Sequence, residues 1–178
     1  MPRRPSRRRW CPATSTSGRY VRLSTHLTRL IHTLPQSVAP AHAFDTLPSG
    51  TYNIYNAAWG SAQLRSYSPD QPIFVSLTRE WPGPFGQWKV EQRDDSNLYT
   101  ITNIGLSSPV HSSNDLVVPG PSGDGFSIEQ AGDNVFTIRV PNQDKVWTVD
   151  TNTVRSDVHL EGQDGTAAQL WRFVPVDY

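Results

Sequence analysis

Three stretches of the chain alternate apolar and polar residues in the same way. They are GTYNIYN at 50–56, NLYTITN at 97–103 and NVFTIRV at 134–140, with Tyr52 and Ile54, Tyr99 and Ile101, and Phe136 and Ile138 at the apolar places. Strict alternation of aromatic and β-branched residues with polar ones is typical of a strand with one buried face. The pattern therefore predicts three equivalent, half-buried strands.

A second apolar pattern, centred on one large aromatic residue, follows each alternating stretch at a distance. Its three copies are centred on Trp88, Phe126 and Trp171. The first two copies run through a short turn rich in Asp, Asn and Gly into the next alternating stretch. The alternating stretches begin 47 and 37 residues apart. A period of about 40 residues indicates a repeat architecture.

Each repeat has room for two more short strands between its first and its last. The candidate segments are 61–67 and 72–77, 108–113 and 115–120, and 145–149 and 157–162. Twelve short strands in three units, at about 48–93, 94–131 and 132–178, predict an all-β protein with the β-trefoil fold. One large aromatic residue of each unit is expected to pack about the pseudo-threefold axis, because a single unit cannot bury its apolar face.

Residues 1–44 differ from the rest of the chain in charge. They contain eight arginines, no acidic residue and the only cysteine, Cys11. This composition fits a disordered basic arm, a leader appended by an erroneous gene prediction, or a mitochondrial presequence. We expect a disordered arm and a cytoplasmic location, with a mitochondrial location as the alternative if the segment is a true presequence.

Residues 45–178 carry eight basic and sixteen acidic residues, a formal charge of −8. Nucleic acid is therefore not expected as a ligand of this part, since phosphate binding requires a basic face. This part has no cysteine, and its two histidines, His111 and His159, lie in separate units, so no metal or other cofactor is expected. No apolar run approaches the ~20 residues of a membrane span.

The sequence Gln169-Leu170-Trp171 resembles the Gln-x-Trp signature of ricin B-like β-trefoils, and the resemblance covers roughly residues 48–178. The first unit has Gln87 directly before its tryptophan, and the second has Phe126 without a glutamine. The chain resembles two groups of fungal trefoils. One group is the ricin B-type lectins, and the other is the protease inhibitors, of the serine-protease kind and of the mycocypin kind that blocks cysteine proteases.

The lectin resemblance implies an acid on the second strand of a unit, an aromatic residue that stacks on the sugar, and an Asn or Asp before the closing motif. In the third unit the acid falls on Thr148, with Asp150 one step out of phase, and Asp164 aligns with the Asn or Asp. The aromatic position falls near Glu161 or Gln163, which offer no ring. The sugar-binding candidates are therefore Asp150, Asp164 and Gln169.

An inhibitor needs a rigid, protruding loop that enters a protease cleft at a small ordering cost. Two connections of the first unit, 64–72 and 78–86, contain arginine, aromatic residues and proline. An exposed arginine could fill the acidic specificity pocket of a trypsin-like protease with a bidentate, charge-assisted bond. The candidates for protease contact are Arg65, Tyr67, Arg79, Glu80 and Trp81.

The sequence thus predicts a non-enzymatic binding protein without catalytic residues. Inhibition of a serine protease through an exposed loop is the leading hypothesis, because no unit keeps the whole sugar-site constellation. Carbohydrate binding, as in ricin B-type lectins, is the alternative. The expected partner is a trypsin-like or papain-like protease, or else a glycan.

Overall fold

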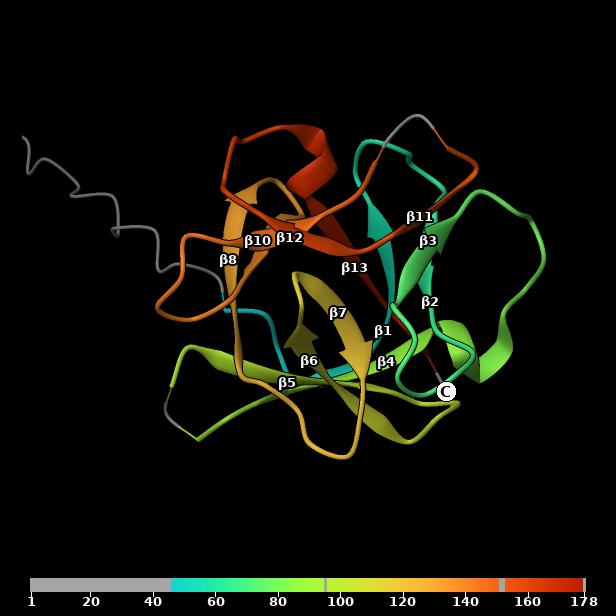
Figure 1. Ribbon diagram of the computed structural model, residues 1–178, viewed down its shortest axis with the longest axis horizontal. Coiled ribbons are helices and arrows are strands. Elements are labelled where there is room, and N and C mark those ends of the chain that lie inside the picture. The colour runs from blue at the N-terminus through green and yellow to red at the C-terminus, as the bar shows by residue number, and fades with distance from the viewer. Residues whose placement is uncertain (1–45, 95, 151–152, 178) are drawn as a thin grey trace, which may run out of the picture. The chain divides into compact units, whose positions relative to one another are not determined.

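The computed structural model describes residues 46–94, 96–150 and 153–177, and its strands form one connected antiparallel sheet system (Figure 1). The prediction for residues 1–44 lies outside the described residues. The strands are β1 (Gly50–Asn56), β2 (Gln63–Arg65), β3 (Phe74–Ser76), β4 (Gln87–Gln92), β5 (Leu98–Asn103), β6 (Ser108–Ser113), β7 (Leu116–Pro119), β8 (Phe126–Gly132), β9 (Val135–Arg139), β10 (Val146–Thr148), β11 (Arg155–Asp157), β12 (His159–Glu161) and β13 (Trp171–Pro175). There are also two short 3-10 helices. η1 (Gly83–Gly86) precedes β4 in the first unit, and η2 (Ala167–Gln169) precedes β13 in the third.

All twelve predicted strands are present, and β11 is an additional short strand that the pattern did not predict. The alternation in the sequence is matched by burial, since Tyr52, Ile54 and Asn56 of β1 are buried while the residues between them are partly exposed. β1 lies between β4 and β13, so the first and last strands that the repeat predicts for the body pair with each other. The predicted all-β architecture of three four-stranded units is confirmed.

A closed ring of three backbone hydrogen bonds marks the pseudo-threefold axis. The Ile73 N–H donates to Val117 O over 2.9 Å, the Val117 N–H to Val158 O over 3.2 Å, and the Val158 N–H to Ile73 O over 2.8 Å. All three side chains are fully buried. The ring makes Ile73, Val117 and Val158 equivalent, and it is the pattern expected of a β-trefoil.

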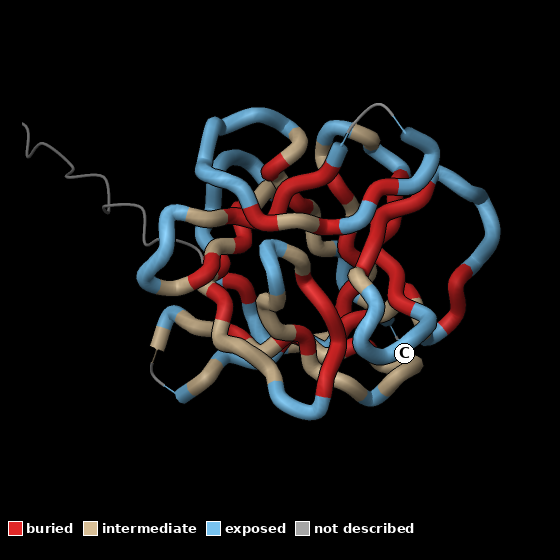
Figure 2. The backbone as a smooth tube through the Cα atoms, in the orientation of Figure 1, coloured by how far each residue is buried: buried red, intermediate tan, exposed pale blue. Residues whose placement is uncertain are grey.

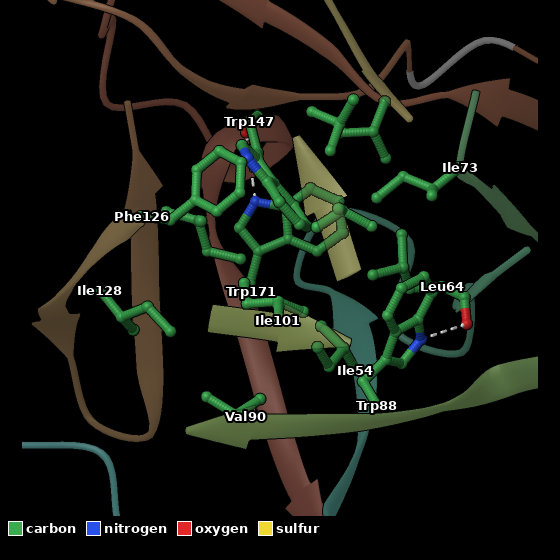
Figure 3. Packing of buried hydrophobic residues seen from close by; sticks show 14 of the residues in the cluster. Ile54, Leu64, Ile73, Trp88, Val90, Ile101, Phe126, Ile128, Trp147 and Trp171 are labelled. Atoms are coloured by element: carbon green, nitrogen blue, oxygen red, sulfur yellow. Dashed lines mark hydrogen bonds between the residues drawn. The ribbon is translucent and has the colours of Figure 1, made fainter. Parts of the chain in front are cut away.

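Two of the three closing aromatic residues are hydrogen-bonded to the second strand of their own unit (Figure 3). The indole N–H of Trp88 donates to Leu64 O over 3.1 Å. The indole N–H of Trp171 donates to Trp147 O over the same distance. Phe126 has no such donor, and there the backbone N–H of Asp124 reaches Val110 O instead.

One cluster of buried aromatic rings lies between the second and third units. The rings of Phe126 and Trp147 lie 5.1 Å apart and those of Trp147 and Trp171 lie 6.0 Å apart, both edge to face. Edge-to-face packing is the favoured arrangement for such rings. Figure 2 shows the buried strands on the inside and the exposed residues in the connections, where a rigid scaffold of this kind carries its binding sites. Among the described residues, no helix is long and apolar enough to span a membrane.

Candidate functional site

Gln169 is a structural residue that holds the last connection of the third unit in place. Its side chain is fully buried, and the Oε1 atom accepts hydrogen bonds from the backbone N–H groups of Asp164, at 2.8 Å, and Gly165, at 3.3 Å. The Nε2 atom donates to Gly162 O over 2.9 Å and to Thr148 Oγ1 over 3.2 Å. The prediction that Gln169 contacts a sugar is therefore wrong, because both ends of its amide are occupied within the protein.

The two other predicted sugar-binding residues, Asp150 and Asp164, do not line one depression. Asp164 is exposed, and its Oδ1 accepts the Thr166 N–H over 2.8 Å. Hydrogen bonds from Thr166 hold the pKa of the Asp164 carboxyl below its usual value, because they stabilise the charged form. Thr148, which occupies the place of the expected acid, is buried and bonded to Gln169.

Arg65 of the first unit is equivalent to Thr148 of the third. Arg65 follows Leu64 and Thr148 follows Trp147, the two residues whose carbonyl groups accept the indole N–H bonds. Only 4% of Arg65 is exposed. Its Nη1 donates to Thr78 Oγ1 over 2.9 Å and its Nη2 to Thr78 O over 2.7 Å. The expectation of an exposed Arg65 that enters a protease pocket is wrong, because the adjacent loop uses the guanidinium as an internal tie.

The candidates for protease contact in the connection 78–86 lie in one exposed segment. Arg79 and Glu80 lie on the surface, and Trp81 is 82% exposed. The loop then turns inward at Pro82, which is buried, and at Gly83, whose φ of 58° favours glycine. The first unit therefore presents a short exposed segment, anchored at Thr78 on one side and at η1 on the other.

A polar depression of about 450 Å³ lies beside β11 and β12 of the third unit. We call it the Asp157 depression, and its lining residues are Leu116, Asp150, Thr153, Arg155, Ser156, Asp157 and His159. Alternate residues of a strand point to the same face, so Arg155 and Asp157 both face outward while Ser156 is buried between them. The Ser156 Oγ accepts the backbone N–H of Asp150 over 2.8 Å and so fixes the position of that residue.

A second, smaller depression of about 240 Å³ adjoins the first. We call it the Tyr67 depression, and it is lined by Ser66, Tyr67, Ser68, Gln71, Pro72, Phe74 and Arg155. Arg155 belongs to both depressions, and its guanidinium carbon lies 3.7 Å from the centre of the Phe74 ring. The two depressions thus meet where β11 of the third unit pairs with β3 of the first.

Of the residues that line the two depressions, the sequence named Asp150 as a sugar-binding candidate and Tyr67 as a candidate for protease contact. It did not name Arg155, Asp157 or His159 as site residues. The segment Arg155–Asp157 has only one buried residue, so no apolar alternation identifies it as a strand. Its place is set by backbone pairing with β3, in another unit. Among the described residues, no group of three or more His, Cys, Asp or Glu side chains is placed to hold a metal ion.

The Asp157 depression offers hydrogen-bond acceptors and donors side by side. The carboxylates of Asp150 and Asp157 accept hydrogen bonds, and the guanidinium of Arg155 donates them. Arg155 Nη2 lies 3.8 Å from Asp157 Oδ1, and His159 Nε2 lies 3.3 Å from Glu161 Oε1. Such a set can bind a ligand whose polar groups both donate and accept.

No protein-family model and no curated protein sequence matches the chain. Among solved structures, the Rhizoctonia solani agglutinin is 20% identical at a TM-score of 0.62, over 73% of this chain and 97% of that one. The Macrolepiota procera ricin B-like lectin, in complex with lactose, is 19% identical at a TM-score of 0.62, over 73% and 99%. The designed threefold-symmetric protein ThreeFoil is 17% identical at a TM-score of 0.62, over 71% and 99%. The described part of this chain has the β-trefoil fold that these structures share.

Proposed function

We propose that this trefoil is a carbohydrate-binding protein and that the sugar binds in the Asp157 depression. The observation that carries the proposal is the outward-facing pair of Arg155 and Asp157 on β11, which line one open polar depression together with Asp150. Sugar hydroxyl groups donate and accept hydrogen bonds at the same time. A site that presents both carboxylates and a guanidinium satisfies them in both directions.

The site is held in place before any ligand arrives, which lowers the ordering cost of binding. Arg155, Ser156 and Asp157 pair through their backbone with Ser76, Val75 and Phe74 of β3. The Ser156 Oγ holds the backbone of Asp150. A carboxylate that is already oriented forms charge-assisted hydrogen bonds, the stronger class of such contacts.

Carbohydrate binding now takes precedence over protease inhibition for two reasons. The guanidinium of Arg65, one of the two arginines expected to enter a protease pocket, is buried and bonded to Thr78. The natural structures compared above are named an agglutinin and a lectin, and the lectin is in complex with lactose. Neither is named as a protease inhibitor, so the likeness supports the alternative hypothesis.

The test is a screen of the full chain on an array of immobilised glycans, followed by calorimetric titration with the strongest soluble hit. We expect Asp157→Asn to weaken that affinity at least tenfold, because a charged acceptor is lost, a change of about 1.4 kcal/mol. Asp133→Asn is the matched control, since Asp133 is an exposed acid in the turn between β8 and β9. An array without any bound glycan, or equal affinities for both variants and the parent chain, would overturn the proposal.

A further inference from the structure

Two depressions lie where β3 of the first unit pairs with β11 of the third. We call the surface formed by the lining residues of both depressions the seam. β3 and β11 lie side by side there (Figure 1), and the Asp157 depression and the Tyr67 depression share Arg155 as a common wall. A ligand seated on one side of Arg155 therefore has the second depression directly beside it. The two depressions are lined by residues of the first and third units and by Leu116 of the second.

Arg155 is fixed between the two depressions. Its guanidinium lies over the Phe74 ring at 3.7 Å, a distance at which the cation is attracted to the face of the ring. Its backbone is paired with Ser76 of β3, and its Nη2 is 3.8 Å from Asp157 Oδ1. The side chain, which is 61% exposed, thus lies between the Phe74 ring and the Asp157 carboxylate.

Tyr67 supplies the aromatic surface that the third unit lacks. Its side chain is 47% exposed, although its ring packs at 5.8 Å against Phe74 and at 5.5 Å against Phe85. Two buttressing rings orient Tyr67 while leaving much of it in solvent. The face of an aromatic ring carries partial negative charge and attracts the positively polarised C–H groups of a sugar ring.

The charges of the seam favour a neutral ligand. The positive charge of Arg155 is already partnered by Asp157 and by the Phe74 ring. Asp150 leaves the wall with a net negative charge, and residues 45–178 as a whole carry a formal charge of −8. Like charges repel, so carboxylated or sulfated sugars are disfavoured at this surface.

We infer that the seam binds a neutral oligosaccharide of at least two sugar rings. One ring lies in the Asp157 depression, where its hydroxyl groups bond to Asp150, Arg155 and Asp157. The next ring crosses Arg155 and stacks on Tyr67. This inference rests on the proposed function and adds to it a minimum ligand length, a charge preference and a second subsite from another unit.

The test is calorimetric titration of the full chain with two neutral series of increasing length. One series is galactose, lactose and lacto-N-tetraose, and the other is N-acetylglucosamine with its β1,4-linked dimer, trimer and tetramer. In the series that binds, we expect the disaccharide to bind about tenfold more tightly than the monosaccharide, and Tyr67→Ala to remove that increment. The affinity for the monosaccharide is expected to stay within about twofold.

Two controls separate stacking from general effects of removing an aromatic residue. Tyr67→Phe keeps the ring and is expected to keep the length dependence. Trp81→Ala removes an exposed ring outside both depressions and is expected to leave every affinity unchanged. A sialylated form of the best ligand is expected to bind more weakly than its neutral parent.

The outcomes distinguish this inference from the proposal on which it rests. If saccharides bind but neither chain length nor Tyr67→Ala changes the affinity, the second subsite is overturned while carbohydrate binding stands. Tighter binding of the sialylated form would overturn the charge preference. If no member of either series and no glycan of the array binds, both proposals are overturned together.

Discussion

The connections between the third and fourth strands of units one and three occupy equivalent places and are held in opposite ways. Both lead through a 3-10 helix, η1 or η2, to the closing tryptophan. In the third unit a loop residue reaches inward, since Gln169 donates to Thr148 of β10. In the first unit a strand residue reaches outward, since Arg65 of β2 donates to Thr78 of the loop.

The difference follows from the residue that lies two positions before the closing tryptophan, which is Gln169 in the third unit. The first unit has Gly86 there, and a Cβ atom on Gly86 would lie 2.2 Å from Pro82 Cγ and 2.7 Å from Gln63 Nε2. The Gln63 amide fills the space and donates to Gly86 O over 3.0 Å. The same trefoil corner is thus closed by different side chains, and the surface outside it differs accordingly.

The comparison shows why the two regions suit different roles. In the first unit the guanidinium of Arg65 is bonded to the loop, and the rest of the loop forms a short exposed segment that contains Trp81. The third unit uses a neutral amide as its tie and leaves Asp150, Arg155 and Asp157 facing a depression. Of the two units, the third therefore combines a rigid base with several polar groups that line a depression.

The largest effect is expected when the tie of the third unit is removed. Gln169→Ala deletes four hydrogen bonds and leaves Gly162 O and two backbone N–H groups without their partner, which lowers the free energy of unfolding by about 3 kcal/mol. Urea unfolding of the full chain measures this, and exposed Gln143→Ala, as the control, is expected to change it by less than about 0.5 kcal/mol. If Gln169→Ala left the free energy of unfolding unchanged but weakened glycan binding, Gln169 would be a ligand residue. The contrast between the two units would then be wrong.

A smaller loss is expected for the tie of the first unit. Arg65→Ala removes two hydrogen bonds and the packing of a buried side chain, so we expect the free energy of unfolding to fall by about 2 kcal/mol. Arg79→Ala, in the exposed part of the same loop, is the control and should change it by less than about 0.5 kcal/mol. Equal stabilities of the two variants would contradict the assignment of Arg65 as an internal tie.

The fold was predictable because its pattern of apolar and polar residues is local and occurs in all three units. Alternating residues are buried on one face of β1 and β5, whereas in β9 Phe136 is partly exposed and Thr137 is buried. The large aromatic residue marks every closing strand. β11 escaped prediction because only Ser156 of its three residues is buried. Its position depends on pairing with β3, a contact between units that no local pattern records.

The site was less predictable because the direction of a polar side chain is decided by tertiary contacts. Arg65 and Arg79 were both predicted to contact a protease, yet the first is bonded to a carbonyl of the loop and the second is exposed. Gln169 was taken for a ligand residue because the motif names it, whereas its burial follows from four partners around it. Asp150 and Tyr67 were identified, but their neighbour Arg155 comes from the strand that was missed.

The smallest effect is expected in the exposed segment of the first unit. Arg79→Ala and Trp81→Ser should leave both glycan affinity and, within about 0.5 kcal/mol, the free energy of unfolding unchanged, because neither residue lines a depression of the seam. Titration of the full chain against trypsin and papain, with residual activity read on a small chromogenic substrate, is expected to show no inhibition. Tight inhibition of trypsin that disappears in Arg79→Ala would transfer the function from the seam to this loop. Inhibition of papain alone, unaffected by Arg79→Ala, would place the protease contact in a different connection of the trefoil.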